Sequence, residues 1–277
     1  TLVVLAFAIV ATAASPLVRV RTFFGVVEVR GEPGVHLEVS GTTIHGVQFT
    51  DERRSEPTAY YVRSGPVGEV MADLHARAAA ASVGVVGLGV GTIAAYARPA
   101  DRLTFFEIDQ AVIDIARDPR WFTYLADAPG PTAVVLGDAR LSLREVAPAS
   151  YDVLVLDAFS SDSVPAHLLT REAIATYLRA LRPGGILLFH LSNRYYDLSP
   201  AVAATAATLG LEAVGRTFVP PPEVAERLHA GPTVMLIAGA AADVERFRAS
   251  GWAHPGSGPV LSDDYSDLIR TLRFASL

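Results

Sequence analysis

The middle of the chain alternates between short apolar runs and longer segments in which apolar residues recur at helical spacing. Near-continuous apolar runs are typical of parallel strands that are covered on both faces, because neither face then needs polar side chains. We therefore expect an α/β fold with a doubly wound parallel sheet and helices on both of its faces. The expected strands are residues 83–86, 103–106, 132–136, 151–156, 186–190 and 233–238, and the expected helices are 67–81, 92–97, 111–117, 170–181 and 200–209.

The pattern before this core is different and predicts a small antiparallel β unit. Between residues 20 and 50, apolar and polar positions alternate in short stretches, and turns that contain glycine separate them. The residues that follow are polar and include Pro57 and Pro66, as a linker would. We expect a small N-terminal β domain with its linker over residues 19–66, and a larger α/β domain over residues 67–277.

An almost unbroken apolar run comes first, and Ser15 and Pro16 end it. The run is shorter than the ~20 residues that a helix needs to cross a bilayer. We interpret residues 1–18 as the end of a transmembrane helix, with a buried element of the fold and the remnant of a signal peptide as alternatives. Arg19 and Arg21 would then form a cytoplasmic flank. The expected location is the membrane, with the larger domain in the cytoplasm, or the cytoplasm alone if the run belongs to the fold.

The composition narrows the classes of function. The 277 residues include no cysteine, which excludes disulfides, thiolate metal sites and cysteine nucleophiles. All 23 basic residues are arginine, so a lysine Schiff base is also excluded. The formal net charge of -6 leaves no basic excess to neutralise phosphates, and we expect no nucleic-acid partner. No group of histidines and carboxylates has the spacing of metal ligands, so we expect no metal.

A glycine-rich turn follows the first strand of the predicted core. Gly87, Gly89 and Gly91 occupy alternate positions and lead into a predicted helix. Glycine permits a tight turn and the close approach of a ligand, while a helix N-terminus offers free N–H groups and a positive dipole end. The turn predicts a nucleotide site, although a tight turn without a ligand is the alternative. Its spacing differs from the dinucleotide-binding G-x-G-x-x-G, and no nucleotide-triphosphate loop is present.

Acidic residues follow the next three strands. Glu107 ends the second strand, where a doubly wound fold places an acid that accepts two hydrogen bonds from the ribose hydroxyls. Asp138 follows the third strand and could accept from an adenine amino group or cap a helix. Asp157 follows the fourth strand, at the edge of the sheet where ligands bind, and could orient a cationic amine or take its proton. The alternative role, a turn or cap, suits Asp162 better.

Two histidines also attract interest. His190 ends an apolar strand, and we interpret it as a histidine whose hydrogen bonds are satisfied in the core rather than as a catalytic group. His45 lies in the N-terminal β unit, and the sequence is equally compatible with a position that faces the cleft and with one that does not.

Taken together, the motifs resemble those of a known group of transferases. The glycine turn, followed by residues 107–109 and 137–139, resembles the class I adenosylmethionine-dependent transferases. With further stretches, the chain resembles the polyamine aminopropyltransferases, the spermidine synthase-like family, and in particular the subgroup fused behind a multi-span membrane domain. These further stretches are residues 45–48, 56–61, 64–68, 157–162 and 262–266.

The resemblance implies a fold, a reaction and a set of site residues. The implied fold is the Rossmann-like fold of class I adenosylmethionine-dependent transferases, beside a small N-terminal β domain. The implied reaction moves an aminopropyl group from decarboxylated S-adenosylmethionine to a small di- or polyamine and releases methylthioadenosine, with Asp157 as the catalytic residue. The residues expected to bind the co-substrate are Gln48, Gly87, Gly89, Gly91, Glu107, Asp109, Asp138 and Ala139. The residues expected to bind the amine are Tyr60 or Tyr61, Asp162, Asp263, Asp264 and Tyr265.

The sequence departs from the family pattern at two points, so the identities of the amine and of the transferred group are not decided. Asp157 and Asp162 lie farther apart than the two acids usual in spermidine synthases, and Val62 stands where members commonly have a histidine. One alternative is therefore a methyltransferase that uses intact S-adenosylmethionine. The other is a non-catalytic domain of a membrane protein that senses an adenosyl nucleotide. A homodimer is the expected assembly.

Overall fold

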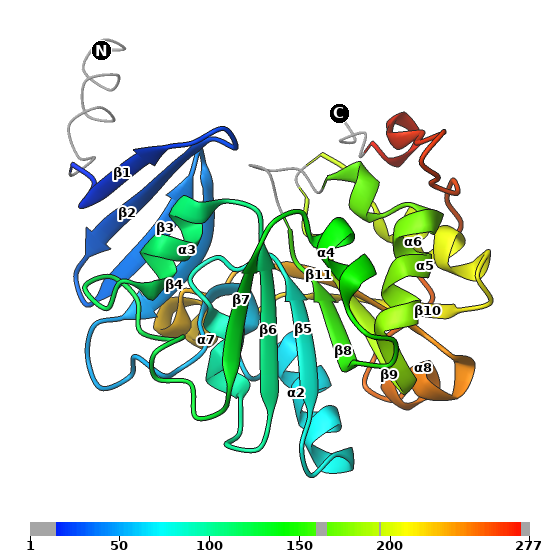
Figure 1. Cartoon of the computed structure of the whole chain (residues 1–277), viewed down its shortest axis with the longest axis horizontal. Helices are drawn as coiled ribbons and strands as arrows, with labels where there is room; N and C mark the ends of the chain where they lie inside the picture. Colours follow the sequence, from blue (N-terminus) through cyan, green and yellow to red (C-terminus); the bar gives the residue numbers. More distant parts are fainter. Residues whose placement is uncertain (1–14, 159–164, 194, 273–277) are drawn as a thin grey trace.

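Two β-sheets organise the molecule in the computed structural model, which describes residues 15–158, 165–193 and 195–272. Figure 1 shows the smaller sheet standing at one side of the larger one. The smaller sheet is an antiparallel meander in the order β1-β2-β3-β4, which confirms the predicted N-terminal β unit. Its strands are β1 (Val18–Arg21), β2 (Val26–Glu32), β3 (Val35–Ser40) and β4 (Thr43–Phe49).

The larger sheet has seven strands in the order β10-β11-β9-β8-β5-β6-β7. It is parallel from β7 to β9 and antiparallel where β9, β11 and β10 pair, so the predicted parallel-rich core is confirmed. The chain runs outward through β5, β6 and β7 and then returns to the other side of β5 as β8. The strands are β5 (Ser82–Val86), β6 (Arg102–Glu107), β7 (Thr132–Leu136), β8 (Tyr151–Leu156), β9 (Leu181–His190), β10 (Glu212–Phe218) and β11 (Thr233–Gly239).

Helices cover both faces of this sheet because successive strand residues point to opposite faces. In β8, Val153 and Val155 pack into one cluster with helices α2, α3 and α8, while Leu154 and Leu156 pack into a second cluster with α4, α5 and α6. The helices are α2 (Pro66–Arg77), α3 (Gln110–Arg117), α4 (Ala139–Glu145), α5 (Arg171–Ala180), α6 (Ser199–Ala207), α7 (Pro222–Leu228) and α8 (Ala241–Arg248), with 3₁₀ turns η1 (Ala59–Tyr61), η2 (Thr92–Tyr96), η3 (Ala166–Leu168) and η4 (Leu268–Thr271).

One predicted helix is shorter and tighter than expected. The segment after the glycine turn forms the 3₁₀ helix η2 rather than an α-helix. Ala97, at its end, is already extended, and Pro99 disfavours helical geometry at the preceding Arg98. A single 3₁₀ turn has a smaller dipole than a full helix, so the glycine turn itself must supply most of any anion-binding character.

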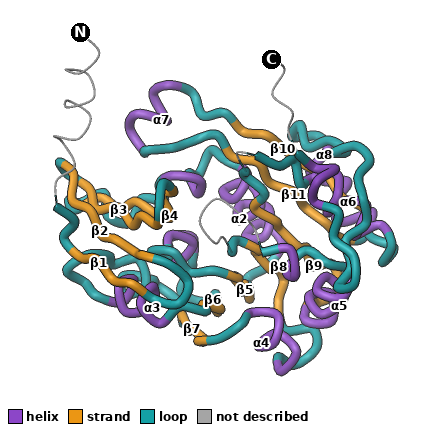
Figure 2. The backbone as a smooth tube through the Cα atoms, turned by 90° about the horizontal axis from the view of Figure 1, so that it is seen from above, coloured by secondary structure: helices purple, strands orange, loops and turns teal. Residues whose placement is uncertain are grey.

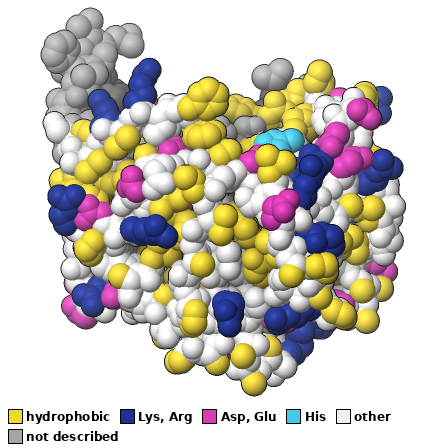
Figure 3. Space-filling model, viewed as in Figure 1, with side chains coloured by type: hydrophobic (Ala, Val, Ile, Leu, Met, Phe, Trp, Pro, Cys, Tyr) yellow, Lys and Arg dark blue, Asp and Glu magenta, His cyan; other side chains and the backbone are white. Residues whose placement is uncertain are grey.

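The apolar start of the chain falls mostly outside the described residues. Residues 1–14 are not described, and Val18 belongs to β1, so the end of the expected segment 1–18 is a strand. Within the three described ranges, no helix combines the length and the apolar character required to cross a bilayer. On the face shown in Figure 3, basic side chains are spread among acidic and apolar ones.

Candidate active site

A cavity of about 360 Å³ opens at the carboxyl ends of β5, β6, β7 and β8. This is the point where the strand order reverses around β5, the usual ligand position in an open α/β sheet. Residues of the small sheet, among them Val27, Ser40 and His45, form the opposite wall. Figure 2 shows strands β1–β4 beside α3 and the ends of the central strands. The cavity therefore lies between the two sheets.

The glycine turn forms the floor of the cavity through Gly87 and Gly89. Gly87, Gly89 and Gly91 have φ angles of 95°, 51° and 83°, a region that other residues rarely adopt. A Cβ atom on Gly87 would lie 2.3 Å from the carbonyl oxygen of Asp157, and one on Gly89 would lie 3.0 Å from that of His45. Gly91 begins η2 and does not line the cavity. The turn thus lets two other segments approach the end of β5 closely.

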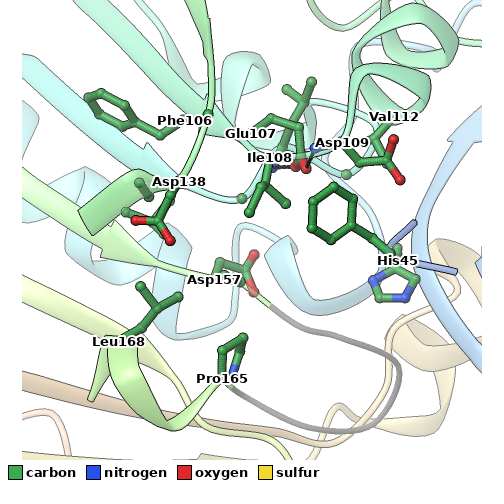
Figure 4. Close-up of a pocket in the computed structure, with 18 of the residues that line it drawn as sticks. His45, Phe106, Glu107, Ile108, Asp109, Val112, Asp138, Asp157, Pro165 and Leu168 are labelled. Atoms are coloured by element: carbon green, nitrogen blue, oxygen red, sulfur yellow. Dashed lines mark hydrogen bonds between the residues drawn. The ribbon is translucent and has the colours of Figure 1, made fainter. Parts of the chain in front are cut away.

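Glu107 lies where the sequence predicted a ribose-binding acid. Its Oε2 accepts a hydrogen bond from the Leu88 amide at 3.0 Å, and its Oε1 accepts one from the Asp109 amide at 2.9 Å. Burial raises the pKa of this carboxyl, while the amide hydrogen bonds oppose that shift. Glu107 lines the cavity and braces the glycine turn. In Figure 4 Glu107, Asp138 and Asp157 surround one space.

Two other acidic residues that are predicted to bind the nucleotide also act as helix caps. Asp109 accepts from the Ala111 amide at 3.0 Å at the start of α3, and from the Thr22 hydroxyl at 2.5 Å. Asp138 accepts from the Leu141 amide at 2.9 Å at the start of α4. Both acids line the cavity, as does Ala139. Both roles that the sequence left open for Asp138 are therefore compatible, since capping uses only part of its acceptor capacity.

Asp157 joins a chain of hydrogen bonds at the base of the cavity. The Tyr61 hydroxyl donates to Asp157 Oδ2, and Nδ1 of His190 lies 2.6 Å from Asp157 Oδ1. Nε2 of His190 lies 2.7 Å from the Ser192 hydroxyl, which accepts from the Val234 amide at 2.9 Å. A carboxylate can only accept, so His190 donates to Asp157 from Nδ1. This arrangement holds the carboxylate by both oxygens.

The two hydrogen-bond partners of Asp157 come from different elements, η1 and β9. Tyr61 lies in η1, and burial followed by the negative charge of Asp157 raises its pKa well above the usual value. Its hydroxyl therefore remains a proton donor. The ring of Tyr60 packs against His190 with a centroid distance of 5.1 Å. Of the two tyrosines, Tyr61 is the one whose hydroxyl contacts Asp157.

His190 is the main residue whose role the sequence underestimated. Its hydrogen bonds are satisfied, as expected, but its partner is the candidate catalytic acid. The sequence did contain a hint of this contact, because Asp157 and His190 stand at the ends of consecutive predicted strands, 151–156 and 186–190. Leu156 of β8 pairs with Phe189 of β9 in parallel register, so the next residues along the two strands, Asp157 and His190, lie side by side.

Gln48, which the resemblance assigned to the co-substrate, is not among the residues that line the cavity. Its side chain is 2% exposed. Its Nε2 donates to the Arg54 carbonyl at 2.7 Å and to the Thr123 hydroxyl at 3.1 Å, and its Oε1 accepts from the Thr123 amide at 2.7 Å. Gln48 therefore ties β4 to two loops, and its contact with the co-substrate stays a prediction.

The structure also separates the C-terminal acids from the cavity. Asp263 accepts hydrogen bonds from Arg140 at 2.8 and 2.6 Å and from Thr170 at 2.8 Å. These bonds, with Arg140 first, lower the pKa of Asp263 to about 2. Asp264 and Tyr265 are exposed, and none of the three lines the cavity. Asp263 pairs with Arg140 in this structure, and the contact of these three residues with the amine stays a prediction. Asp162 lies outside the described residues.

Two further ionisable residues of the small sheet line the cavity. His45 does so, which settles the alternative that the sequence left open. Glu38 does so as well, although the sequence did not single it out. Burial, followed by the negative charges of Glu107 and Asp109, raises the pKa of Glu38 to about 8. Among the residues described, no group of three or more metal-ligating side chains could hold a metal ion.

Sequence comparisons connect the chain with enzymes that act on polyamines. No protein-family model matches it. The polyamine aminopropyltransferase of Vibrio vulnificus (strain CMCP6) is 31% identical over 120 residues, 41% of this chain and 39% of that protein. The probable polyamine aminopropyl transferase of Bifidobacterium longum (strain NCC 2705) is 27% identical over 177 residues, 62% of this chain and 37% of that protein. Putrescine N-methyltransferase 1 of Nicotiana tabacum is 30% identical over 90 residues, 31% of this chain and 23% of that protein. The chain spans at most 39% of the length of these relatives.

Structural comparisons cover nearly the whole chain. A probable spermidine synthase from Corynebacterium glutamicum ATCC 13032 aligns with a TM-score of 0.66 at 17% identity, over 92% of this chain and 99% of that one. Spermidine synthase from Thermotoga maritima aligns with a TM-score of 0.55 at 14% identity, over 94% of this chain and 84% of that one. The chain therefore has the Rossmann-like fold of spermidine synthases with a small antiparallel N-terminal sheet, and its sequence similarity is to spermidine synthase-like proteins.

Proposed function

We propose that this chain is an aminopropyltransferase that moves an aminopropyl group from decarboxylated S-adenosylmethionine to a di- or polyamine. The observation that carries the proposal is the position of Asp157. Its carboxylate lies at the base of the cavity beside the glycine turn, with Tyr61 and His190 on its two oxygens. Such a group can bind a cationic amine and receive its proton. The similarity to polyamine aminopropyltransferases supports this assignment.

The nucleoside half of the co-substrate is proposed to bind at the ends of β5, β6 and β7. Gly87 and Gly89 allow its close approach, and Glu107 accepts from the ribose hydroxyls while keeping its two amide partners. Asp138 and Ala139 line the part of the cavity proposed for the adenine, and Asp109 lines the cavity on the same side. These residues fit a nucleoside because they offer acceptors for hydroxyl and amino groups.

The proposed reaction is a single displacement. The neutral nitrogen of the amine attacks the aminopropyl carbon next to the sulfonium, the carbon–sulfur bond breaks, and its electron pair leaves with methylthioadenosine. Asp157 accepts one proton from the bound ammonium, which makes that nitrogen neutral for the attack, and the new secondary nitrogen then carries the positive charge that the sulfonium loses. The protein contributes proximity and orientation, and Tyr61 and His190 hold the carboxylate in position. Each atom and charge is accounted for without a covalent enzyme intermediate.

A putrescine-type methyltransferase is the second candidate. It would use intact S-adenosylmethionine and the same two halves of the cavity, and the similarity to putrescine N-methyltransferase 1 favours it. A domain that binds an adenosyl nucleotide without turnover is the remaining alternative. The two enzymes differ in the mass that they add to the amine, and the sensor adds none.

The proposal also includes the assembly of the protein, its attachment to a membrane and its division into domains. A homodimer and attachment to a membrane through residues 1–18 are expected, the latter because of the apolar run. The division at residue 66 into a small β domain and a catalytic domain belongs to the same proposal. Sedimentation velocity and membrane fractionation of the full chain test the assembly and the attachment.

The central experiment combines product identification with two variants. The protein is incubated with decarboxylated or intact S-adenosylmethionine and a panel of di- and polyamines. The products are identified by their masses in a mass spectrometer. Asp157→Asn should reduce turnover by about 10²–10⁴, the range for a positioned proton acceptor, and retain nucleotide affinity. Glu107→Gln should weaken nucleotide binding by about 1–3 kcal/mol. The aminopropyltransferase assignment fails if only methylated amines form, and both enzyme assignments fail if nucleotide binds without any product.

A further inference from the structure

Glu38 is a buried acid in the wall of the cavity. Its side chain belongs to β3, and the residue is 2% exposed. Within the described part of the chain, its Oε2 atom is buried and has no hydrogen-bond partner. Buried polar atoms are nearly always paired, and leaving one unpaired costs more free energy than an ordinary hydrogen bond contributes. The missing partner therefore points to a ligand.

The pleat of β3 directs Glu38 toward the cavity. Val35 and Leu37 pack on one face of the strand with Phe49, while Glu38 and Ser40 line the cavity on the other. The pairing of β3 with β4 shifts register directly after Glu38, a local bulge. Bulges re-aim side chains and are common beside functional sites. The position of Glu38 is thus set by the strand itself.

The charged groups around Glu38 are mostly negative. Glu107 and Asp109 lie close enough to raise its pKa, after burial, to about 8, and Glu38 in turn raises the pKa of Tyr61. His45 and Asp157 line the same cavity, and no arginine is among its described lining residues. A carboxyl in these surroundings becomes an anion readily only when a cation arrives. Glu38 is thus close enough to interact electrostatically with both the acid proposed for the ribose and the tyrosine that holds Asp157.

We propose that Glu38 binds the cationic aminopropyl-sulfonium arm of the co-substrate and selects a nucleoside whose arm carries no carboxylate. This inference rests on the proposed function, since it concerns the same cavity. A primary ammonium or a sulfonium is attracted to Glu38, whereas the carboxylate of intact S-adenosylmethionine would face Glu38, Glu107 and Asp109 together. Like charges repel more strongly beside a buried group such as Glu38, where the effective dielectric constant is lower than in water. Glu38 is therefore a specificity-determining residue for the decarboxylated co-substrate.

The same contact couples binding to proton release. At neutral pH the free Glu38 carboxyl holds a proton, because burial and its acidic neighbours raise its pKa to about 8. When the cation binds, the carboxylate form is favoured and the proton leaves to the buffer. Methylthioadenosine has the same nucleoside without a positive charge, so it should bind without this release.

The test is isothermal titration calorimetry with three nucleosides: decarboxylated S-adenosylmethionine, the intact form and methylthioadenosine. Titrations in buffers with different ionisation enthalpies give the number of protons released. Wild-type protein should prefer the decarboxylated form and release protons with it, and not with methylthioadenosine. Glu38→Gln should weaken the decarboxylated form by about 10- to 100-fold, abolish the proton release and leave methylthioadenosine binding unchanged.

Glu28→Gln is the matched control, because Glu28 is also a largely buried acid of the small sheet but pairs with Arg19 and Arg30 and does not line the cavity. It should bind all three nucleosides as wild type does. Equal weakening of all three by Glu38→Gln, or wild-type proton release that is the same for methylthioadenosine, overturns the inference and leaves the proposed function intact. Failure of wild-type protein to bind any of the three overturns the proposed function and the inference together.

Discussion

Nδ1 of His190 lies 2.6 Å from Oδ1 of Asp157, and the two residues end neighbouring parallel strands. The carboxylate is held from its other side by Tyr61, which comes from the segment between the two sheets. A carboxylate held by two donors cannot rotate freely, and Asp157 also lines the cavity and has lone pairs left to accept further hydrogen bonds. The geometry is that of an acid prepared to receive one more donor, such as the N–H of an amine.

His190 should act as a positioning residue for Asp157. His190→Ala removes one charged hydrogen bond, and kcat/KM for the amine should fall by about 10- to 100-fold, the equivalent of 1.5–3 kcal/mol. His190→Gln can still donate a hydrogen bond and should recover part of the loss. The readouts are kcat and KM for the amine across a pH series, with nucleotide affinity measured separately. A loss that appears only in nucleotide affinity, or no rescue by glutamine, would contradict this role.

Tyr61→Phe should reduce kcat/KM for the amine by about tenfold, because it removes the second donor to Asp157. The raised pKa of Tyr61 means that the hydroxyl stays protonated, so the loss should not depend on pH near neutrality. Tyr124→Phe is the control, since the Tyr124 hydroxyl is also buried but donates to the Glu56 carbonyl at 2.7 Å, away from the cavity. Both variants should lose about 1 kcal/mol of stability in denaturant titrations. Equal kinetic losses in the two would show that stability alone explains the effect.

Asp263→Asn should lower stability and leave amine kinetics unchanged, since Asp263 pairs with Arg140 outside the cavity. The loss should be about 1 kcal/mol, because the Asp263 side chain is 43% exposed and water screens the pair. The folded pKa of about 2 lies below the unfolded value of 3.8, so this stabilisation is present above pH 3.8 and disappears as the pH falls toward 2. Urea titrations of both proteins over that range measure it. An increase in KM for the amine would restore the role that the sequence predicted.

Glu38 should make the free protein less stable as the pH rises. Its pKa is raised from 4.5 in the unfolded chain to about 8 in the fold, so its neutral form favours folding below pH 4.5 and this contribution is lost up to about pH 8. The change is a few kcal/mol, at roughly 1.4 kcal/mol per unit of pKa shift. Glu38→Gln cannot ionise, so the difference in unfolding free energy between the two proteins should change across this interval. Parallel stability curves would place the carboxyl in contact with water.

The fold was predictable because the strands of the core carry their apolar residues almost without interruption. β8 and the second half of β9, residues 186–190, are examples, and helices cover both faces there. β10 was not predicted, because Gly215 and Arg216 interrupt its apolar pattern, and it forms through pairing with β11. The α-helix predicted after the glycine turn became 3₁₀ because the proline that follows limits its length.

The site was predictable only where it depends on strand ends. Glu107, Asp138 and Asp157 follow parallel strands, and the topology brings such positions together. The positions of the Gln48 and Asp263 side chains depend on the groups that they hydrogen-bond in the folded chain. The sequence pattern does not show which groups those are. Glu38 was missed for a related reason, since its importance comes from the acids of another sheet.

The close contact between Gly87 and the Asp157 backbone has a consequence for engineering. A methyl group at position 87 would lie 2.3 Å from that carbonyl oxygen, so the spacing between β5 and β8 at this level is set by main-chain contact. In the proposed reaction, the distance between the glycine turn and the Asp157 main chain is therefore a fixed dimension of the scaffold. Acceptor preference, in contrast, can be altered at side chains such as Pro165 and Leu168, which line the cavity. A library confined to those positions would change which amine enters without changing that main-chain distance.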